Sequence, residues 1–156
     1  MLTHIVAKTV VFDEAGKVLV LRRSADDTHR PGGDDFPGGK VEEGEGIFEG
    51  AVREIAEEAG LQMSPSDLQL IFATTKAGYN TDHKTDINIV WLGFVAKLPK
   101  SQAVTLSHEH QSFKWFSLDE AIADCDGPTQ KNFMEAIRDR NLADQFVRVS
   151  KRAGDA

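Results

Sequence analysis

The chain has 156 residues, of which 40% are hydrophobic and 28% are charged. This length fits one compact domain, and the balance of apolar and charged residues excludes an intrinsically disordered chain. The formal net charge of −7 disfavours binding to duplex nucleic acid, because an acidic surface repels the phosphate backbone. We expect a single domain over residues 1–149, followed by a polar tail at residues 150–156.

The strands and helices predicted from the sequence alternate along the chain. Strands are predicted at residues 3–12 and 17–21, where β-branched residues are frequent, and a short turn joins them into a hairpin. Prolines and glycines predict a loop at residues 24–39. The elements predicted after this loop are a helix at 46–60, strands at 68–77, 86–98 and 113–116, a helix that begins at Ser117, and a helix at 128–142. This mixture favours an α/β protein with a layered sheet.

The cellular compartment can also be predicted. The chain has one cysteine, Cys125, so it has no internal disulfide framework and a reducing compartment is favoured. The longest unbroken apolar stretch, residues 89–96, is far shorter than the roughly 20 residues that a membrane-spanning helix needs. The first residues also lack the pattern of a signal peptide. We therefore expect a cytoplasmic protein with no membrane partner.

Three carboxylates share one side of the helix predicted at residues 46–60. Glu54, Glu57 and Glu58 are spaced at i, i+3 and i+4, beside the apolar stripe that faces the core. Like charges at this spacing cost a helix about 0.2–0.5 kcal/mol per pair, and a divalent cation would remove the repulsion. Carboxylate oxygens suit Mg²⁺ or Mn²⁺. The alternative is a solvated acidic face, which the scarcity of interleaved lysines weakens.

Arg53 lies one turn before Glu57 on the same helix. At this spacing it can orient the Glu57 carboxylate by a charge-assisted hydrogen bond. The alternative is an ordinary surface ion pair, which contributes little to stability.

The segment at residues 39–61 resembles the signature of the Nudix hydrolase family. That signature reads G-x5-E-x7-R-E-U-x-E-E-x-G-U, where U is a bulky aliphatic residue. Every fixed position is filled, by Gly39, Glu45, Arg53, Glu54, Ile55, Glu57, Glu58, Gly60 and Leu61. The resemblance implies a Nudix-type α/β/α sandwich with a mixed β-sheet. It also implies hydrolysis of a pyrophosphate bond in a nucleoside diphosphate linked to another group, with Mg²⁺ or Mn²⁺ as cofactor.

The resemblance assigns roles to individual residues. Glu54, Glu57 and Glu58 correspond to the metal-binding carboxylates of the family, and the backbone carbonyl of Gly39 corresponds to a further ligand. Arg53 corresponds to the arginine that orients a metal-binding glutamate.

Family members differ in the carboxylate that takes the proton from the attacking water. Glu54 is the candidate base within the signature. Glu109, in the polar segment before the strand predicted at residues 113–116, is the candidate from a distant loop. The alternative for this segment is a plain polar connection, so both assignments of the base stay open.

Residues outside the signature determine the substrate. Arg22 and Arg23 are candidates for phosphate contacts, although alternate side chains of a strand face opposite ways and one of the two is then a solvated edge residue. Phe36 and Tyr79 are candidates for stacking on a base, which needs an aromatic face. The alternatives are a core phenylalanine and a plain turn tyrosine.

The predicted function is cleavage of a pyrophosphate bond in a small-molecule nucleotide by metal-activated water. Nucleoside triphosphates, including oxidised nucleotides, and dinucleoside polyphosphates both fit the sequence. The alternative is a catalytically silent Nudix-like sensor that binds a nucleotide without turnover. A sensor predicts erosion of the signature carboxylates, and none is eroded. Members of the family are often dimers, so the resemblance leaves a homodimer open.

Overall fold

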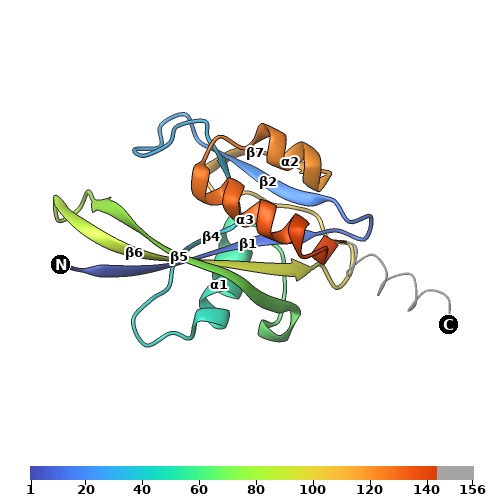
Figure 1. The fold of residues 1–156 in the computed structure, drawn as a ribbon, viewed down its shortest axis with the longest axis horizontal. Helices are drawn as coiled ribbons and strands as arrows, with labels where there is room; N and C mark the ends of the chain where they lie inside the picture. Colours follow the sequence, from blue (N-terminus) through green and yellow to red (C-terminus); the bar gives the residue numbers. More distant parts are fainter. Residues whose placement is uncertain (144–156) are drawn as a thin grey trace.

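The computed structural model describes residues 1–143, and a mixed sheet of seven strands runs through them (Figure 1). The strands along the main path have the order β3-β2-β1-β6-β5, while β4 pairs with β1 and β7 pairs with β2. Only the β1–β6 pair is parallel among these pairings. The strands are β1 (Thr3–Phe12), β2 (Val18–Arg23), β3 (Asp34–Asp35), β4 (Gly38–Lys40), β5 (Leu68–Asn80), β6 (Thr85–Lys97) and β7 (His110–Phe116).

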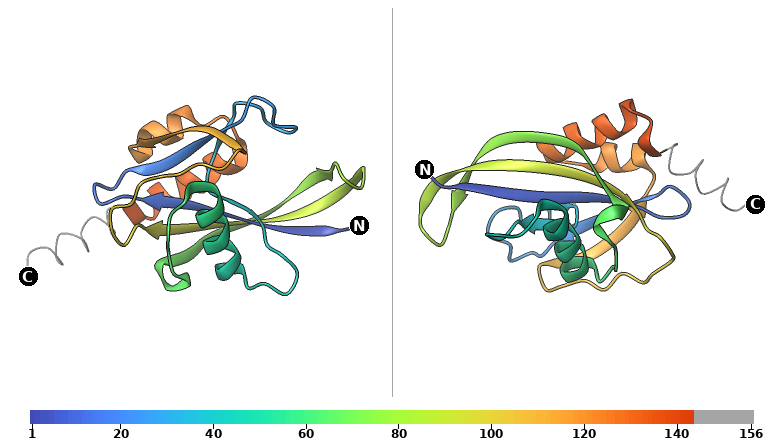
Figure 2. Two further views of the ribbon diagram at one scale, coloured as in Figure 1. Left: turned by 180° about the vertical axis from the view of Figure 1, so that it is seen from behind. Right: turned by 90° about the horizontal axis from the view of Figure 1, so that it is seen from below.

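The helices cover both faces of the sheet. They are α1 (Ile47–Ala59), the 3-10 turn η1 (Pro65–Asp67), α2 (Leu118–Asp124) and α3 (Pro128–Asp139). In the right-hand view of Figure 2, α1 lies on one side of the sheet, and α2 and α3 lie on the other. Alternate residues of β1 supply the two cores, because Ala7 and Val11 belong to the cluster around α1, and Val10 and Phe12 belong to the cluster around α3. The predicted α/β/α sandwich is therefore confirmed.

Most of the predicted elements are present. Helix α1 ends where Gly60 adopts the left-handed conformation with φ 69°, and Ser117 caps α2 by accepting a hydrogen bond from the backbone N–H of Glu120. β5 and β6 are joined by a shorter turn than predicted, because β5 continues to Asn80 and β6 begins at Thr85. The predicted tail at residues 150–156 lies outside the described residues.

The segment predicted as a loop at residues 24–39 contains two short strands. β4 pairs with β1, and its Gly38 lies opposite Lys8. A Cβ atom on Gly38 would collide with the carbonyl oxygen of Ala7, so the close approach of the two backbones requires glycine. Strands this short carry no hydrophobic period, which is why the sequence did not predict them.

None of the helices within residues 1–143 has the length and apolar character needed to cross a membrane.

Candidate active site

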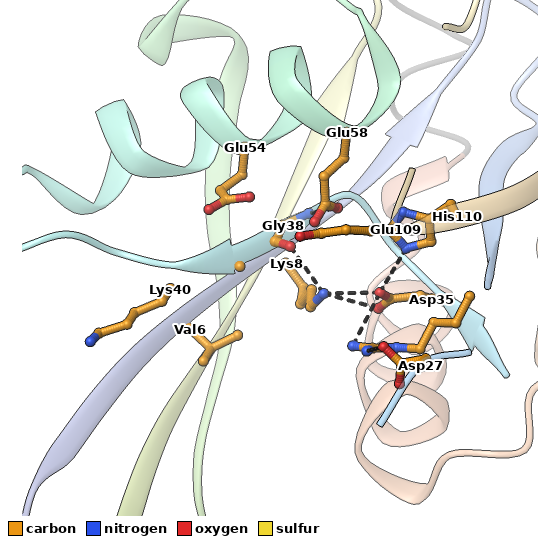
Figure 3. A pocket seen from close by; sticks show the side chains of 12 residues that line it. Val6, Lys8, Asp27, Asp35, Gly38, Lys40, Glu54, Glu58, Glu109 and His110 are labelled. Carbon is orange, nitrogen blue, oxygen red and sulfur yellow. Dashed lines mark hydrogen bonds and ion pairs between the residues drawn. The ribbon is translucent and has the colours of Figure 1, made fainter. Parts of the chain in front are cut away.

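A cavity of about 380 Å³ lies between α1 and the crossing of β1 and β4 (Figure 3). Its walls come from segments that are far apart in the sequence. Its charged lining residues are Lys8, Arg23, Asp27, Asp35, Lys40, Glu54, Glu58, Glu109 and His110. Both signs of charge therefore meet in one cavity, although the chain as a whole is acidic.

Helix α1 brings Glu54 and Glu58 to the cavity. Ala51, Ile55 and Ala59 are buried against the sheet, so side chains beside this stripe face the edge where β4 runs. In Figure 3 both glutamates point from the helix toward β4.

The glycines of β4 meet these two carboxylates. The backbone N–H of Gly38 donates a hydrogen bond of 3.0 Å to Oε2 of Glu58. A Cβ atom on Gly39 would lie 2.8 Å from Oε1 of Glu54, so any larger residue there would push this carboxylate out of its present position. The double glycine therefore gives both carboxylates direct access to the backbone of β4.

Both carboxylates sit where a negative charge is costly. The pKa of Glu58 is raised to about 8, chiefly by burial. The charge of Lys8 and the Gly38 N–H oppose the shift, and the neighbouring Asp35 and Glu109 add to it. Burial also raises the pKa of Glu54, against the opposing effect of Arg53. A nearby cation would stabilise the ionised forms of both groups.

Arg53 holds the signature carboxylates together. Its Nε and Nη2 atoms donate to the two oxygens of Glu45, at 2.7 and 3.1 Å. Its Nη1 donates to Glu54 and to Glu57, at 3.1 Å each, and Nη2 reaches the Lys40 carbonyl at 3.1 Å. The two-pronged pair with Glu45 fixes the guanidinium plane, which in turn orients Glu54 and Glu57. This network differs from an isolated surface ion pair, and Glu45 is the partner that helical spacing alone did not indicate.

Glu57 is placed differently from the other two glutamates. Its side chain is 57% exposed and it is not among the residues that line the cavity. The reason is helical geometry, because at about 100° per residue Glu57 lies roughly 100° around the helix from Glu58, on the solvent side. Within residues 1–143, no three or more His, Cys, Asp or Glu side chains already converge as a metal site.

Glu109 enters the cavity from the loop before β7. The backbone N–H of Ser24 donates to the Glu109 carbonyl at 3.0 Å, and the Ser24 hydroxyl donates to the His108 carbonyl at 2.8 Å. These two bonds attach the loop to the end of β2. Figure 3 shows the Glu109 side chain extending between Glu58 and His110.

A buried network lies beside the carboxylates, and sequence analysis missed it. Asp35 accepts hydrogen bonds from Lys8 and His110, at 3.1 Å each, and Arg23 lies 3.4 Å from it. Burial alone would raise the pKa of Asp35, but Lys8, the hydrogen bond with His110 and Arg23 together hold it well below its usual range. The available signal was a lysine at position 8 in the inner part of β1, where the flanking residues Ala7 and Thr9 are buried.

The two arginines predicted to contact phosphates point to different places. Arg23 lines the cavity and pairs with Asp27 at 3.1 Å. Arg22 lies outside the cavity lining, donates to the Gly32 carbonyl at 2.9 Å and lies 3.4 Å from Asp34. The alternation of side chains along β2 separates them.

The aromatic candidates lie away from the cavity. Phe36 is only 2% exposed and packs edge-on against Phe133 in the core under α3. The prediction that Phe36 stacks on a base therefore needs correction, because its ring has no open face. Tyr79 is 49% exposed. The sheet register aligns the cavity residue Val6 with Thr74 of β5. Tyr79 lies five residues further along β5, which corresponds to roughly 16 Å of strand.

One further cation belongs to this region. Partial burial, followed by the nearby charges of Arg30, Lys8 and Arg23, lowers the pKa of Lys76 on β5. The sheet register places Lys76 on the same face as Lys8. Lys76 thus lies near the cations Lys8 and Arg23 but is not among the residues that line the cavity.

The protein is an α/β sandwich in which two glutamates of helix α1, Glu54 and Glu58, face the two glycines of strand β4. A model of the NUDIX domain matches residues 2–137. The chain therefore belongs to the Nudix family, as the signature predicted, and its class is that of the Nudix hydrolases.

Similar proteins support this membership. The CTP pyrophosphohydrolase of Escherichia coli (strain K12) is 30% identical over 140 residues, which cover 86% of this chain and 93% of that protein. The asymmetrical bis(5'-nucleosyl)-tetraphosphatase of Caenorhabditis elegans is 36% identical over 86 residues, and the match spans 59% of its length. The crystal structure of a MutT protein from Methanosarcina mazei Go1 has a TM-score of 0.74 and 26% identity, and covers 90% of this chain and 96% of that one.

Proposed function

We propose that this Nudix hydrolase cleaves a pyrophosphate bond of a small-molecule nucleotide, with Mg²⁺ or Mn²⁺ held at the α1 edge of the cavity. The observation that carries the proposal is that Glu54, Glu58 and Glu109 line one cavity together with the two glycines of strand β4. The names of the similar proteins, a CTP pyrophosphohydrolase and a tetraphosphatase, add support for a nucleoside triphosphate or a dinucleoside polyphosphate as substrate.

The residues present fit a divalent cation. Glu54, Glu58 and Glu109 line one cavity, and burial raises the pKa of both Glu54 and Glu58, so a cation among these carboxylates would stabilise their ionised forms. The missing Cβ of Gly39 leaves its backbone open beside Glu54. Glu54, Glu58 and the Gly39 carbonyl would hold the ion with hard oxygen donors. Glu57 would join them only by leaving its hydrogen bond with Arg53.

A bound Mg²⁺ or Mn²⁺ ion would supply Lewis acidity, which neutralises the diphosphate charge and makes bound water a stronger acid. The protein's residues do the rest. Glu109 takes the proton of the attacking water, because its side chain enters the cavity from a separate loop and lies beside Glu58 (Figure 3). Glu54 is the alternative base, but it is tied to Arg53. Arg23 and Lys40, which also line the cavity, attract the phosphate chain.

The second candidate function is a silent sensor that binds nucleotides without turnover. Every signature carboxylate is present, and this favours the enzyme. A cytoplasmic location and a homodimer stay predictions from the sequence.

The test is turnover of a nucleotide panel with Mg²⁺ or Mn²⁺, with products identified by chromatography. The panel holds CTP and the other nucleoside triphosphates, oxidised dGTP, diadenosine polyphosphates, ADP-ribose and nucleotide sugars. We expect metal-dependent cleavage of a triphosphate or a dinucleoside polyphosphate far above the rest. Nucleotide binding without cleavage of any member, in a folded and metal-bound protein, would instead indicate the sensor.

A further inference from the structure

The ammonium group of Lys8 is fully occupied by three acceptors from one short segment. Lys8 is 6% exposed. Its Nζ atom donates to Oδ2 of Asp35 at 3.1 Å, to the Phe36 carbonyl at 3.4 Å and to the Gly38 carbonyl at 3.1 Å. An ammonium has three protons to donate. Lys8 therefore has no proton left for a substrate phosphate, and all of its bonds fix residues 35–38.

The same segment supports both carboxylates of α1. Gly38 contacts both Lys8 and Glu58. Its carbonyl accepts a hydrogen bond from Lys8, and its N–H donates one to Glu58 at 3.0 Å. The next residue, Gly39, lies against Glu54. The register of β1 and β4 places Lys8 opposite Gly38. The Gly38 backbone therefore links Lys8 to Glu58 through two hydrogen bonds.

We infer that Lys8 is a positioning residue, which fixes the Gly38–Gly39 backbone so that Glu58 and Glu54 are held ready for the divalent cation. This inference rests on the proposed function. Lys8 acts through Gly38 and does not touch the substrate. Loss of such a supporting contact typically weakens metal binding by roughly 10- to 100-fold.

The inference can be separated from two simpler roles of a buried lysine. If Lys8 acted only as a positive charge near the site, its removal would tighten the binding of a divalent cation, since a repulsion is lost. If Lys8 served only to neutralise Asp35, then removing both charges together would restore function. Asp35 would still have His110 at 3.1 Å and Arg23 at 3.4 Å. Only positioning predicts weaker binding in both variants.

The experiment compares Lys8→Met, the double variant Lys8→Met/Asp35→Asn and a control, Lys100→Met, which removes an exposed lysine far from the cavity lining. Mn²⁺ binding to each nucleotide-free protein is measured by calorimetry. The Gly38 amide is followed by NMR hydrogen exchange in the metal-free state. The double variant also removes the buried charge of Asp35, which in Lys8→Met has lost one of its cationic partners, and keeps the test possible if Lys8→Met alone does not fold.

We expect both Lys8 variants to bind Mn²⁺ roughly 10- to 100-fold more weakly than the wild type and to exchange the Gly38 amide faster, while the control matches the wild type. Unchanged or tighter Mn²⁺ binding in Lys8→Met, or wild-type binding in the double variant, would overturn the inference. A wild-type protein that binds no Mn²⁺ would instead contradict the proposed function, so the two failures are distinct.

Discussion

The side chains of Glu58 of α1 and Glu109 of the loop before β7 come together inside the cavity (Figure 3). Burial, and to a smaller extent the neighbouring Asp35 and Glu109, raises the pKa of Glu58, so a cation placed between the two carboxylates would stabilise the ionised form of Glu58.

The first prediction concerns pH and stability without metal. Burial raises the pKa of Glu58 to about 8 in the folded protein, above the 4.5 of a solvated glutamate, so the native state binds more protons than the unfolded state between these values. Stability should therefore fall as the pH rises from about 4.5 to 8. Urea unfolding in EDTA at several pH values measures this, and Glu58→Gln should flatten the dependence. A pH-independent stability of the wild type would show that Glu58 titrates normally.

The second prediction concerns the contribution of the Glu58 charge to turnover. Glutamine keeps an oxygen acceptor for the Gly38 N–H but carries no charge, so the fold of Glu58→Gln should persist. Turnover should fall by roughly 10²-fold or more, because charge stabilisation of this kind is worth that much. Steady-state kinetics, with circular dichroism as the check on folding, test it. Near-wild-type turnover would remove Glu58 from the metal site.

The third prediction separates Glu57 from Glu58. Glu57 is exposed and bonded to Arg53, so Glu57→Gln should change the free energy of unfolding by no more than about 0.5 kcal/mol. Its turnover should nevertheless fall if the carboxylate moves onto the ion. Urea unfolding and kinetics on the same preparation measure both quantities. Full activity of Glu57→Gln would show that Glu57 stays with Arg53 during catalysis.

The fourth prediction concerns Arg53. Lysine cannot reproduce the two-pronged contact with Glu45, so Arg53→Lys should lower kcat by roughly 10- to 100-fold. Arg138→Lys on α3, where the arginine makes an exposed pair with Asp139, is the matched control and should match the wild type. If both variants kept full kcat, the guanidinium plane would have no part in orienting Glu54 and Glu57.

The fifth prediction tests the base. General base catalysis is worth roughly 10²- to 10⁴-fold, so Glu109→Gln should lower kcat within that range and change the acid limb of the pH–rate profile. A small loss of rate with an unchanged pH profile would return the role of base to Glu54.

The sequence predicted the acidic half of the cavity, but not the cationic half. Helical period and Gly60 were enough to place Glu54 and Glu58 on one edge of α1. Lys8 lies on β1 and Asp35 on β3, and the two meet only when β3 pairs with β2 and the following β4 pairs with β1. Strand alternation indicates which face a side chain occupies, but not which partner will neutralise it there.

Phe36 shows the same limit for substrate recognition. Phe36 lies just before the two glycines of β4, which fitted a role in base stacking. In the structure, however, Phe133 of α3 packs against its ring in the core. A tertiary contact of this kind has no local signal. The substrate-binding residues were accordingly the least predictable part of the site.

The most direct test of the central claim is a paired measurement of Mn²⁺ binding and nucleotide hydrolysis on the wild type and on Glu58→Gln. We predict that the wild type binds Mn²⁺ and hydrolyses a nucleoside triphosphate or a dinucleoside polyphosphate only when the metal is present. The variant should lose both properties while remaining folded. Hydrolysis by the wild type in the presence of EDTA, or undiminished hydrolysis by Glu58→Gln, would contradict the account.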